Sequence, residues 1–447
     1  MADFDAEWFA GRLGDRTTQG IARETAALIR NGMLPVGSKL PPVRDIAYAL
    51  GVSPATVSTA WSDLRRHKII EGRGRNGAWV RTDRFTARPE RHMSGGNYGP
   101  GILNLAIAEP DVALLPPLGA ALAHGARAER LNSYERVRIL PELEMAVRPD
   151  WPYEPGAFLA TNGGYNAIYT LLHALVRPGV PVAIEDPTAL RLLDILEDLN
   201  VPILLVECDR EGPLPHSLAK ALEQRPAVFI FQPRVHSVTG ALMSAGRLEA
   251  LGDVLAPADV LIIEDDGVGD ICEAPRISLG RRFPDRVIHV LSFSKTHGPD
   301  LRLAVLSSSA TLVEQIQSYR SFSSGWTSRI LQAATAWLLN DPETATIVAR
   351  AREVYKRRRE VLAEELDRQG VAVEAGHGLS VLIPVMQENY AMVTLAARGI
   401  AVHAGAKFSL GTTNSIRVAT SILPQEKVAH VARSIALAAD PARTDKG

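Results

Sequence analysis

The spacing of apolar residues near the start of the chain predicts three helices. Residues 20–31 carry apolar side chains along one helical face. A second, short helix begins near Pro42 and ends at Gly51. Ser53 is placed to cap a third helix that runs to about His67. This third helix has an apolar inward face of Val57, Ala60, Trp61 and Leu64, and an outward face of Pro54, Ala55, Thr56, Thr59 and Asp63.

The residues that follow the third helix predict a β-hairpin. Ile69–Glu71 and Ala78–Val80 have strand composition, and the basic, glycine-rich stretch Gly72–Gly77 lies between them. Two short helices joined by a tight turn and followed by such a hairpin form a winged helix-turn-helix, which is a DNA-binding arrangement. A helical adaptor that binds protein is the alternative.

From residue 102 onward, short apolar strands alternate with helical stretches, which predicts an α/β domain with a mainly parallel sheet. A long helical region at 328–369 then precedes two strand-like stretches, typical of a smaller C-terminal α+β domain. We therefore expect a winged helix-turn-helix domain at 1–82, a linker at 83–101 and a second domain at 102–447, with a large part at about 102–327 and a small part at about 328–440. The predicted strands are Val182–Glu185, Ile203–Val206, Ala227–Gln232, Val260–Ile263, Val287–Ser292, Ala304–Ser307, Leu379–Val385 and Ser415–Thr420.

Composition narrows the class of protein. The 447 residues are 46% hydrophobic and 22% charged, an ordinary folded composition. Cys208 and Cys272 are too few for a disulfide framework or a cysteine-based zinc site, so we expect no metal. No apolar run reaches the roughly 20 residues of a membrane span, and the N-terminus lacks the pattern of a signal peptide. We expect a cytoplasmic protein with no membrane contact.

Charge is unevenly distributed along the chain. Residues 20–91 hold 13 Lys or Arg and six Asp or Glu, a net charge of +7, while the whole chain carries −1. A basic module joined to an acidic body favours contact with double-stranded DNA, although a solvated charged surface is the alternative. The residues expected to neutralise phosphates are Arg44, Arg65, Arg66, Arg73 and Arg75. The residues expected to meet base edges are Ser53, Pro54, Thr56 and Thr59.

Two predicted strands end in reactive side chains. Val260–Ile263 leads into Glu264-Asp265-Asp266, and Val287–Ser292 leads toward Lys295. Ligands of parallel sheets bind beyond the carboxyl ends of the strands, so these groups can face one crevice. An aldehyde cofactor needs a lysine for attachment and a carboxylate that keeps its ring nitrogen protonated. A solvated lysine beside an acidic loop is the alternative.

Further residues favour a phosphate and a carboxylate as ligands. Gly163 and Gly164 precede an apolar helix, where free backbone N–H groups can receive a phosphate. Ser292, Ser294 and Arg302 flank Lys295 and can complete a phosphate cup. Arg417 stands mid-strand, where it either binds a carboxylate or points outward.

The chain resembles the MocR subfamily of GntR-type regulators, in which a winged helix-turn-helix is fused to a fold-type I aminotransferase-like domain. The resemblance covers residues 20–437 and is most specific at Arg30–Pro41, Leu50–Ser53, Ile262–Asp266, Ser292–Thr296 and Leu301–Leu303. It implies pyridoxal 5′-phosphate (PLP) as cofactor, an amino-acid-like effector and a head-to-tail homodimer. It also implies that Lys295 forms the internal aldimine, Asp265 pairs with the pyridine nitrogen and Arg417 takes the effector carboxylate. The other implied PLP contacts are Gly163, Gly164, Tyr165, Ser237, Ser292, Ser294 and Arg302.

The sequence departs from the family pattern at four positions. Pro54 replaces a common Arg of the recognition helix. Ala189 stands where an aromatic usually stacks on the PLP ring, and Ser237 and Gly267 replace groups that bond the ring hydroxyl, with His236 as a possible substitute. These changes predict weak PLP retention or poor catalysis, and predict that Tyr at position 189 or 267 tightens PLP binding.

The sequence thus favours a DNA-binding transcriptional regulator whose aminotransferase-like domain binds PLP, with at most weak transamination. One alternative is a catalytically active PLP-dependent aminotransferase. The other is a regulator that has lost PLP and senses a different ligand.

Overall fold

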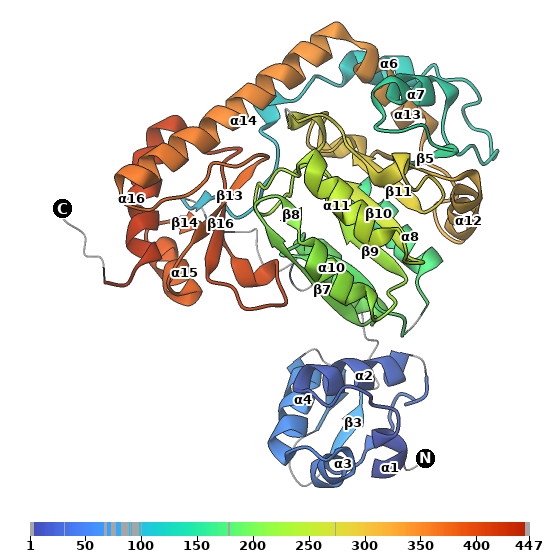
Figure 1. Ribbon diagram of the computed structural model, residues 1–447, viewed down its shortest axis with the longest axis vertical. Helices are drawn as coiled ribbons and strands as arrows, with labels where there is room; N and C mark the ends of the chain where they lie inside the picture. The colour runs from blue at the N-terminus through green and yellow to red at the C-terminus, as the bar shows by residue number, and fades with distance from the viewer. Residues whose placement is uncertain are drawn as a thin grey trace. The chain divides into compact units, whose positions relative to one another are not determined.

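The computed structural model describes residues 4–30, 32–66, 69–72, 77–81, 89, 91, 98–99, 101–177, 179–272 and 274–442 (Figure 1). The chain divides into two compact units. One comprises Met1–Pro89 with Leu196–Asn200, and the other comprises Glu90–Ile195 with Val201–Gly447.

The first unit is a helical bundle with a small sheet, as expected for a winged helix-turn-helix. Its elements are α1 (Ala6–Ala10), α2 (Thr18–Arg30), β1 (Lys39–Leu40), α3 (Val43–Leu50), α4 (Pro54–Arg66), β2 (Ile70–Glu71) and β3 (Ala78–Val80). The Ser53 side chain accepts a hydrogen bond from the N–H of Thr56 at 3.1 Å, which confirms the predicted helix cap. Val57, Ala60, Trp61 and Leu64 are all at most 2% exposed, because their spacing places them on the face of α4 that meets the core.

The sequence did not predict α1 or β1. Phe9 of α1 is fully buried and packs edge-on against Trp61 at 5.8 Å. The strand β1 pairs antiparallel with β3, so the sheet has the order β1-β3-β2. Gly72 has a φ of +92°, and a Cβ there would lie 2.4 Å from the carbonyl oxygen of Gly77. The base of the hairpin therefore requires glycine at this position.

The second unit is built on an eight-stranded sheet of order β5-β12-β11-β10-β9-β6-β7-β8. Strands β11, β10, β9, β6 and β7 are parallel, while β12 runs antiparallel to both of its neighbours. The strands are β5 (Ala157–Thr161), β6 (Val182–Asp186), β7 (Ile203–Asp209), β8 (Gly212–Pro213), β9 (Val228–Phe231), β10 (Leu261–Asp266), β11 (Val287–Ser292) and β12 (Ala304–Ser308). The helices of this part are α6 (Gly119–Gly125), α7 (Pro141–Val147), α8 (Gly164–Leu175), α9 (Leu190–Leu199), α10 (Pro215–Leu222), α11 (Ala245–Leu255), α12 (Ala310–Arg320) and α13 (Arg329–Asn340).

The long helix α14 (Pro342–Arg368) leads from the large sheet to a smaller C-terminal part (Figure 1). That part contains β4 (Leu103–Asn104), β13 (Ser380–Pro384), α15 (Glu388–Ala397), β14 (Ile400–Ala401), β15 (His403–Ala404), β16 (Ser415–Ala419) and α16 (Val428–Ala439). Its own core of buried aliphatic residues lies between β13, β16, α14 and α16. The predicted α/β class, with a mainly parallel sheet and a smaller α+β part, is confirmed. Within the described residues, no helix has both the length and the apolar character needed to cross a membrane.

Candidate functional site

Strand topology brings the predicted PLP residues to one edge of the large sheet. Because β12 is antiparallel to β11 and to β5, those two strands end at the same edge. Thr161 and Ser292, their last residues, both face Ala304 at the start of β12. Strand β10 is parallel to β11 and ends there as well. The residues that follow β5, β10 and β11 and precede β12 therefore meet around one site.

Lys295 lies half-buried at this edge. Its Nζ donates a hydrogen bond to the carbonyl oxygen of Ala108 at 2.5 Å. The pKa of Lys295 is lowered to about 8, mainly by burial and further by the positive charges of Arg417 and Arg191. The negative charge of Glu109 acts in the opposite direction. A larger fraction of the amine is thus neutral near pH 7, which is the form that attacks an aldehyde.

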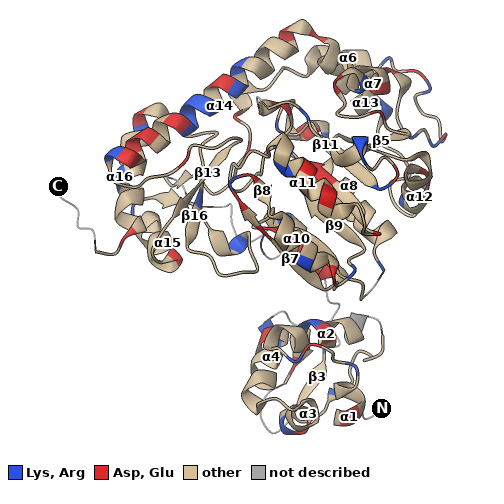
Figure 2. Ribbon diagram, viewed as in Figure 1, with Lys and Arg blue, Asp and Glu red and all other residues tan. Residues whose placement is uncertain are grey.

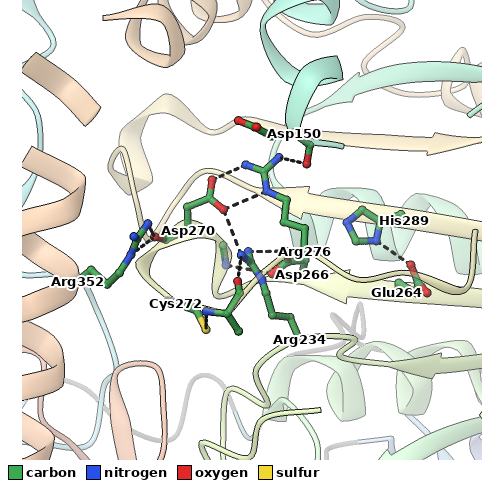
Figure 3. A network of polar contacts seen from close by, with 11 residues as sticks. Asp150, Arg234, Glu264, Asp266, Asp270, Cys272, Arg276, His289 and Arg352 are labelled. Carbon is green, nitrogen blue, oxygen red and sulfur yellow. Dashed lines mark hydrogen bonds and ion pairs between the residues drawn. The ribbon is translucent and has the colours of Figure 1, made fainter. Parts of the chain in front are cut away.

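The structure distinguishes among the three adjacent acids of β10. Glu264 accepts hydrogen bonds from Ser278, the N–H of Leu279 and the ring of His289, the last at 2.7 Å. Asp266 forms a buried ion pair with Arg234 at 2.8 Å (Figure 3). Side chains alternate along a strand, so Asp265 points to the face opposite its two neighbours.

Asp265 has the character required of a partner for a protonated ring nitrogen. Among the described residues, its carboxylate accepts no hydrogen bond. Burial, with smaller contributions from Glu185 and Asp266, raises its pKa to about 7. A positively charged N–H of a ligand would reverse this effect and hold the carboxylate ionised.

Glycines, serines and an arginine form a cradle at the start of α8. Gly163 is the N-cap of that helix, with a φ of +96°, and a Cβ there would lie 3.4 Å from a terminal nitrogen of Arg302. A Cβ on Gly164 would likewise approach Ser292 to 3.4 Å. The hydroxyl of Ser292 lies 3.3 Å from that of Ser294. Backbone N–H groups, two hydroxyls and a guanidinium thus lie close together, and these are the donors that a phosphate requires.

Arg417 lies on β16 and is 8% exposed. Its Nη2 donates to the carbonyl oxygen of Ala106 at 2.7 Å, and its guanidinium lies 4.4 Å from the ring centre of Phe408. Its buried Nε has no hydrogen-bond partner among the described residues. An unpartnered buried donor is costly, so it is an observation in favour of a carboxylate ligand. These residues fit PLP and a carboxylate in donor type and position.

The positions that depart from the family pattern offer little to the ring. Ala189 is buried and has no aromatic group. Ser237 is fixed through its backbone, since its N–H donates to Gln232 Oε1 at 2.8 Å. His236 donates from Nε2 to the carbonyl of Pro187, and its Nδ1 accepts from two backbone N–H groups. Both nitrogens of His236 are therefore used within the fold, and this histidine does not replace the missing ring contact.

Gly267 is a position where geometry limits substitution. A Cβ on this residue would lie 3.3 Å from Asp265 Oδ1. This is tighter than ordinary van der Waals contact, so any side chain at position 267 pushes on the acid that is expected to pair with the ring. The expectation that Tyr at this position tightens PLP binding is therefore revised.

Sequence reasoning missed Arg191 as a site residue. Its guanidinium lies 4.7 Å from the ring centre of Tyr165, within the range of a cation–π contact. The same charge contributes to the lowered pKa of Lys295, so Arg191 is close to the attachment point. Its signal in the sequence was a basic residue two positions after the missing aromatic at Ala189.

A separate cleft of about 540 Å³ is lined by the loop after β10 and the beginning of α14. Four arginines contribute to it, but they are largely engaged within the protein (Figure 3). Arg276 forms two hydrogen bonds with the Asp270 carboxylate, and Arg352 donates twice to the Asp270 carbonyl oxygen. This network fixes the loop that follows Asp265 to α14. No group of three His, Cys, Asp or Glu side chains in the described part of the chain could hold a metal ion.

The predicted DNA-contacting residues that the structure describes lie on α3, on α4 or, for Ser53, directly before α4, and Figure 2 marks the charges on these helices. Arg44 is exposed on α3, and Pro54 and Thr59 are exposed on α4. Two of the predicted phosphate ligands have contacts within the unit. Arg66 pairs with Asp63 at 2.6 Å, and Arg65 donates to the carbonyl of Gly72 at 3.4 Å. Arg73 and Arg75 lie outside the described residues.

Comparison with known proteins matches each of the two units to a protein family. Residues 17–80 match the gntR family of bacterial regulatory proteins, and residues 100–435 match the class I and II aminotransferases. The vitamin B6 salvage pathway transcriptional repressor PtsJ of Salmonella typhimurium is 30% identical over 411 residues, covering 90% of this chain and 94% of its own. The chain belongs to the MocR subfamily of GntR regulators. The pyridoxine biosynthesis transcriptional regulator PdxR of Corynebacterium glutamicum is 24% identical over 406 residues, which cover 88% of this chain and 88% of its own.

Solved structures similar to this regulator include aminotransferases. A multiple substrate aminotransferase from Thermococcus profundus superposes with a TM-score of 0.69 at 20% identity, over 78% of this chain and 96% of its own. Aspartate aminotransferase from Thermus thermophilus with maleate superposes with a TM-score of 0.66 at 23% identity, over 75% of this chain and 91% of its own. At these identities the similarity establishes the fold of the second unit.

Proposed function

We propose that this regulator binds operator DNA through its first unit and responds to PLP bound in its second unit. The observation that carries the proposal is the meeting of Lys295, Asp265 and the Gly163–Arg302 cradle at one sheet edge. Lys295 provides the point of attachment, Asp265 binds the ring nitrogen, and the cradle binds the phosphate. When bound, PLP supplies an aldehyde and an electron-accepting ring.

Two relatives are named for pathways of vitamin B6, which supports PLP itself as the signal. Arg417 adds a place for a carboxylate, so an amino-acid-like effector that binds beside PLP is the second part of the proposal. A DNA target supports a cytoplasmic location, which is part of the proposal.

Transamination is at most weak in this proposal. Ala189 provides no aromatic surface, Gly267 has no side chain, and Ser237 replaces a group that bonds the ring hydroxyl in the family pattern. The presence of both Lys295 and Asp265 favours the alternative of an active aminotransferase. The missing ring contacts favour the alternative of a regulator that binds a different ligand.

An absorbance titration with PLP tests the ligand. Wild type should develop a visible band that borohydride converts into a permanent adduct, and Lys295→Ala should show neither while remaining folded. The same adduct in Lys295→Ala would place the attachment on another lysine. No band in wild type would favour the regulator that has lost PLP.

Footprinting tests the DNA-binding part. We expect protection of a discrete site upstream of a target gene and an affinity that falls steeply with salt, as phosphate neutralisation requires. Binding that does not change with salt would refute the proposed interface.

An exposed aromatic surface supports the proposed homodimer. Phe322 is 90% and Tyr134 is 88% exposed, and each contacts a further aromatic ring, Tyr319 and Trp326 respectively. Exposed apolar surface of this kind marks protein–protein contact. Light scattering should give twice the 48.3 kDa chain mass, and Phe322→Asp should lower it; a wild-type mass of one chain would refute the dimer.

A further inference from the structure

One segment of the second unit contacts both expected ligand-binding cations. We name Leu103–Asp111 the strap. At its beginning, the carbonyl of Leu105 accepts a hydrogen bond from the N–H of Ala419 at 2.8 Å. At its end, the N–H of Asp111 donates to the hydroxyl of Tyr355 on α14 at 2.9 Å. The strap therefore runs from the small C-terminal part to the long helix.

Between these anchors, two strap carbonyls accept hydrogen bonds from charged side chains of the site. Ala106 O accepts from Arg417 Nη2 at 2.7 Å, and Ala108 O accepts from Lys295 Nζ at 2.5 Å. Both are bonds from a cationic group, which are stronger than those between neutral groups. Glu109, the next residue of the strap, adds an attraction for the Lys295 ammonium.

Attachment of an aldehyde at Lys295 changes what its nitrogen can donate. The amine nitrogen forms a double bond to the aldehyde carbon, and the aldehyde oxygen leaves as water with two hydrogens. The nitrogen then carries at most one hydrogen instead of the three of an ammonium group. That hydrogen lies in the plane of the new double bond, so the nitrogen can no longer be aimed freely at Ala108 O.

A carboxylate at Arg417 competes for the second contact. Carboxylates bind guanidinium groups through two parallel N–H bonds. The side-on pair of Arg417 consists of Nε–H, which lacks a partner among the described residues, and Nη2–H, which donates to Ala106 O. A carboxylate that takes this pair displaces or weakens the bond to the strap.

We propose that the strap is the element through which ligand occupancy is transmitted: PLP at Lys295 and a carboxylate at Arg417 take the two cations from Ala108 and Ala106 and release the strap. The inference rests on the proposed function, because it uses the same two ligands. Only Ile102 separates the strap from residues 83–101, which join it in the sequence to the DNA-binding unit. We take this covalent connection as the route by which a change in the strap would reach the DNA-binding unit.

Hydrogen–deuterium exchange of full-length protein tests the release. The amides of Leu105, Glu109 and Asp111 are hydrogen-bonded in the structure and report on the strap. We expect PLP to speed their exchange by about tenfold, roughly the value of one lost charge-assisted hydrogen bond. PLP with propionate, a carboxylate that has no amine and so leaves the Lys295 linkage in place, should speed it further. Unchanged or slower exchange when PLP is attached would overturn the proposal.

Two variants separate the strap from PLP binding itself. Lys295→Met, without PLP, should already exchange faster in the strap and should not respond to PLP. The matched control, Arg302→Ala, changes the phosphate cradle but no strap contact, so without PLP its strap should exchange as in wild type. If no PLP attaches to wild type, the proposed function fails, and the exchange of Lys295→Met alone decides whether the strap contacts matter. If PLP attaches and neither wild type nor Lys295→Met changes, the strap proposal fails alone.

Discussion

At the scale of single residues, the chemistry of the site depends on which acids and bases the fold leaves unused. Glu264 and Asp266 are committed to His289 and Arg234, whereas Asp265 between them has no hydrogen-bond partner in the described part of the chain. Alternation along one strand is enough to give three neighbouring acids different roles. Lys295 is set apart in a similar way, by burial and by two nearby arginines.

The lowered pKa of Lys295 predicts a pH profile for PLP attachment. With a pKa of about 8, roughly a tenth of the amine is neutral at pH 7, against less than a thousandth for an ordinary lysine. The rate of borohydride-trapped attachment should rise with pH up to about 8 and then level off. Arg191→Gln removes one of the charges that lower this pKa, so its profile should shift to higher pH.

Arg302→Gln is the matched control, because Arg302 is not among the charges that act on Lys295. It should weaken PLP binding and leave the midpoint of the profile in place. Equal midpoints in wild type and Arg191→Gln would contradict the assigned role of Arg191.

A second prediction concerns the space beside Asp265. Gly267→Ala places a methyl group about 3.3 Å from the carboxylate and should weaken PLP about fivefold, the factor that ~1 kcal/mol represents. Gly246→Ala is the control, since its nearest neighbour would be 3.9 Å away on the exposed side of α11. A PLP titration of both variants checks this, and tighter binding by Gly267→Ala would show that the acid has room to move.

At the scale of elements, the sequence predicted the parallel strands well because each is a continuous apolar run. The predicted Val287–Ser292 is β11, and the other predicted strands differ from the observed ones by a few residues at their ends. The strand β5 was missed, although it positions Gly163. The sequence of β12 does not reveal that this strand runs antiparallel, because the direction of a strand depends on its pairing with distant strands. The contacts that occupy His236 and place Arg191 over Tyr165 are likewise tertiary, so residue spacing could not reveal them.

The recognition elements of the first unit allow a matched comparison of two arginines. Arg44 on α3 is exposed and has no ion-pair partner among the described residues, whereas Arg66 on α4 is held by Asp63. Arg44→Ala should therefore reduce the slope of log affinity against log salt by about 0.9, the value for one phosphate contact. Arg66→Ala should reduce it by clearly less. Equal slopes for the two variants, measured on one operator fragment, would contradict Arg44 as a phosphate ligand.

At the scale of the whole molecule, an aminotransferase fold is retained while features that serve turnover are reduced. The large sheet, the cradle and the lysine–aspartate pair are present. From the family pattern, we expect Ala189, Ser237 and Gly267 to leave a bound ring without some of its usual contacts. A site that holds a ligand but does not process it efficiently suits a sensor, because the signal persists as long as the ligand is bound.

This arrangement predicts poor turnover in wild type. Efficient transamination requires the substrate, the ring and the proton-transferring group to be held together in one geometry. Here neither His236, whose two nitrogens bind backbone groups, nor Gly267, which lacks a side chain, is available to the ring hydroxyl. We expect fewer than roughly one turnover per second, the lower end of ordinary enzymes, with any common amino acid as donor. Single-turnover absorbance and steady-state assays on PLP-loaded protein test this, with Lys295→Ala as the background. Rates within the ordinary range of ~1–1000 per second would show that turnover does not need the missing contacts, and would make the protein an aminotransferase that also binds DNA.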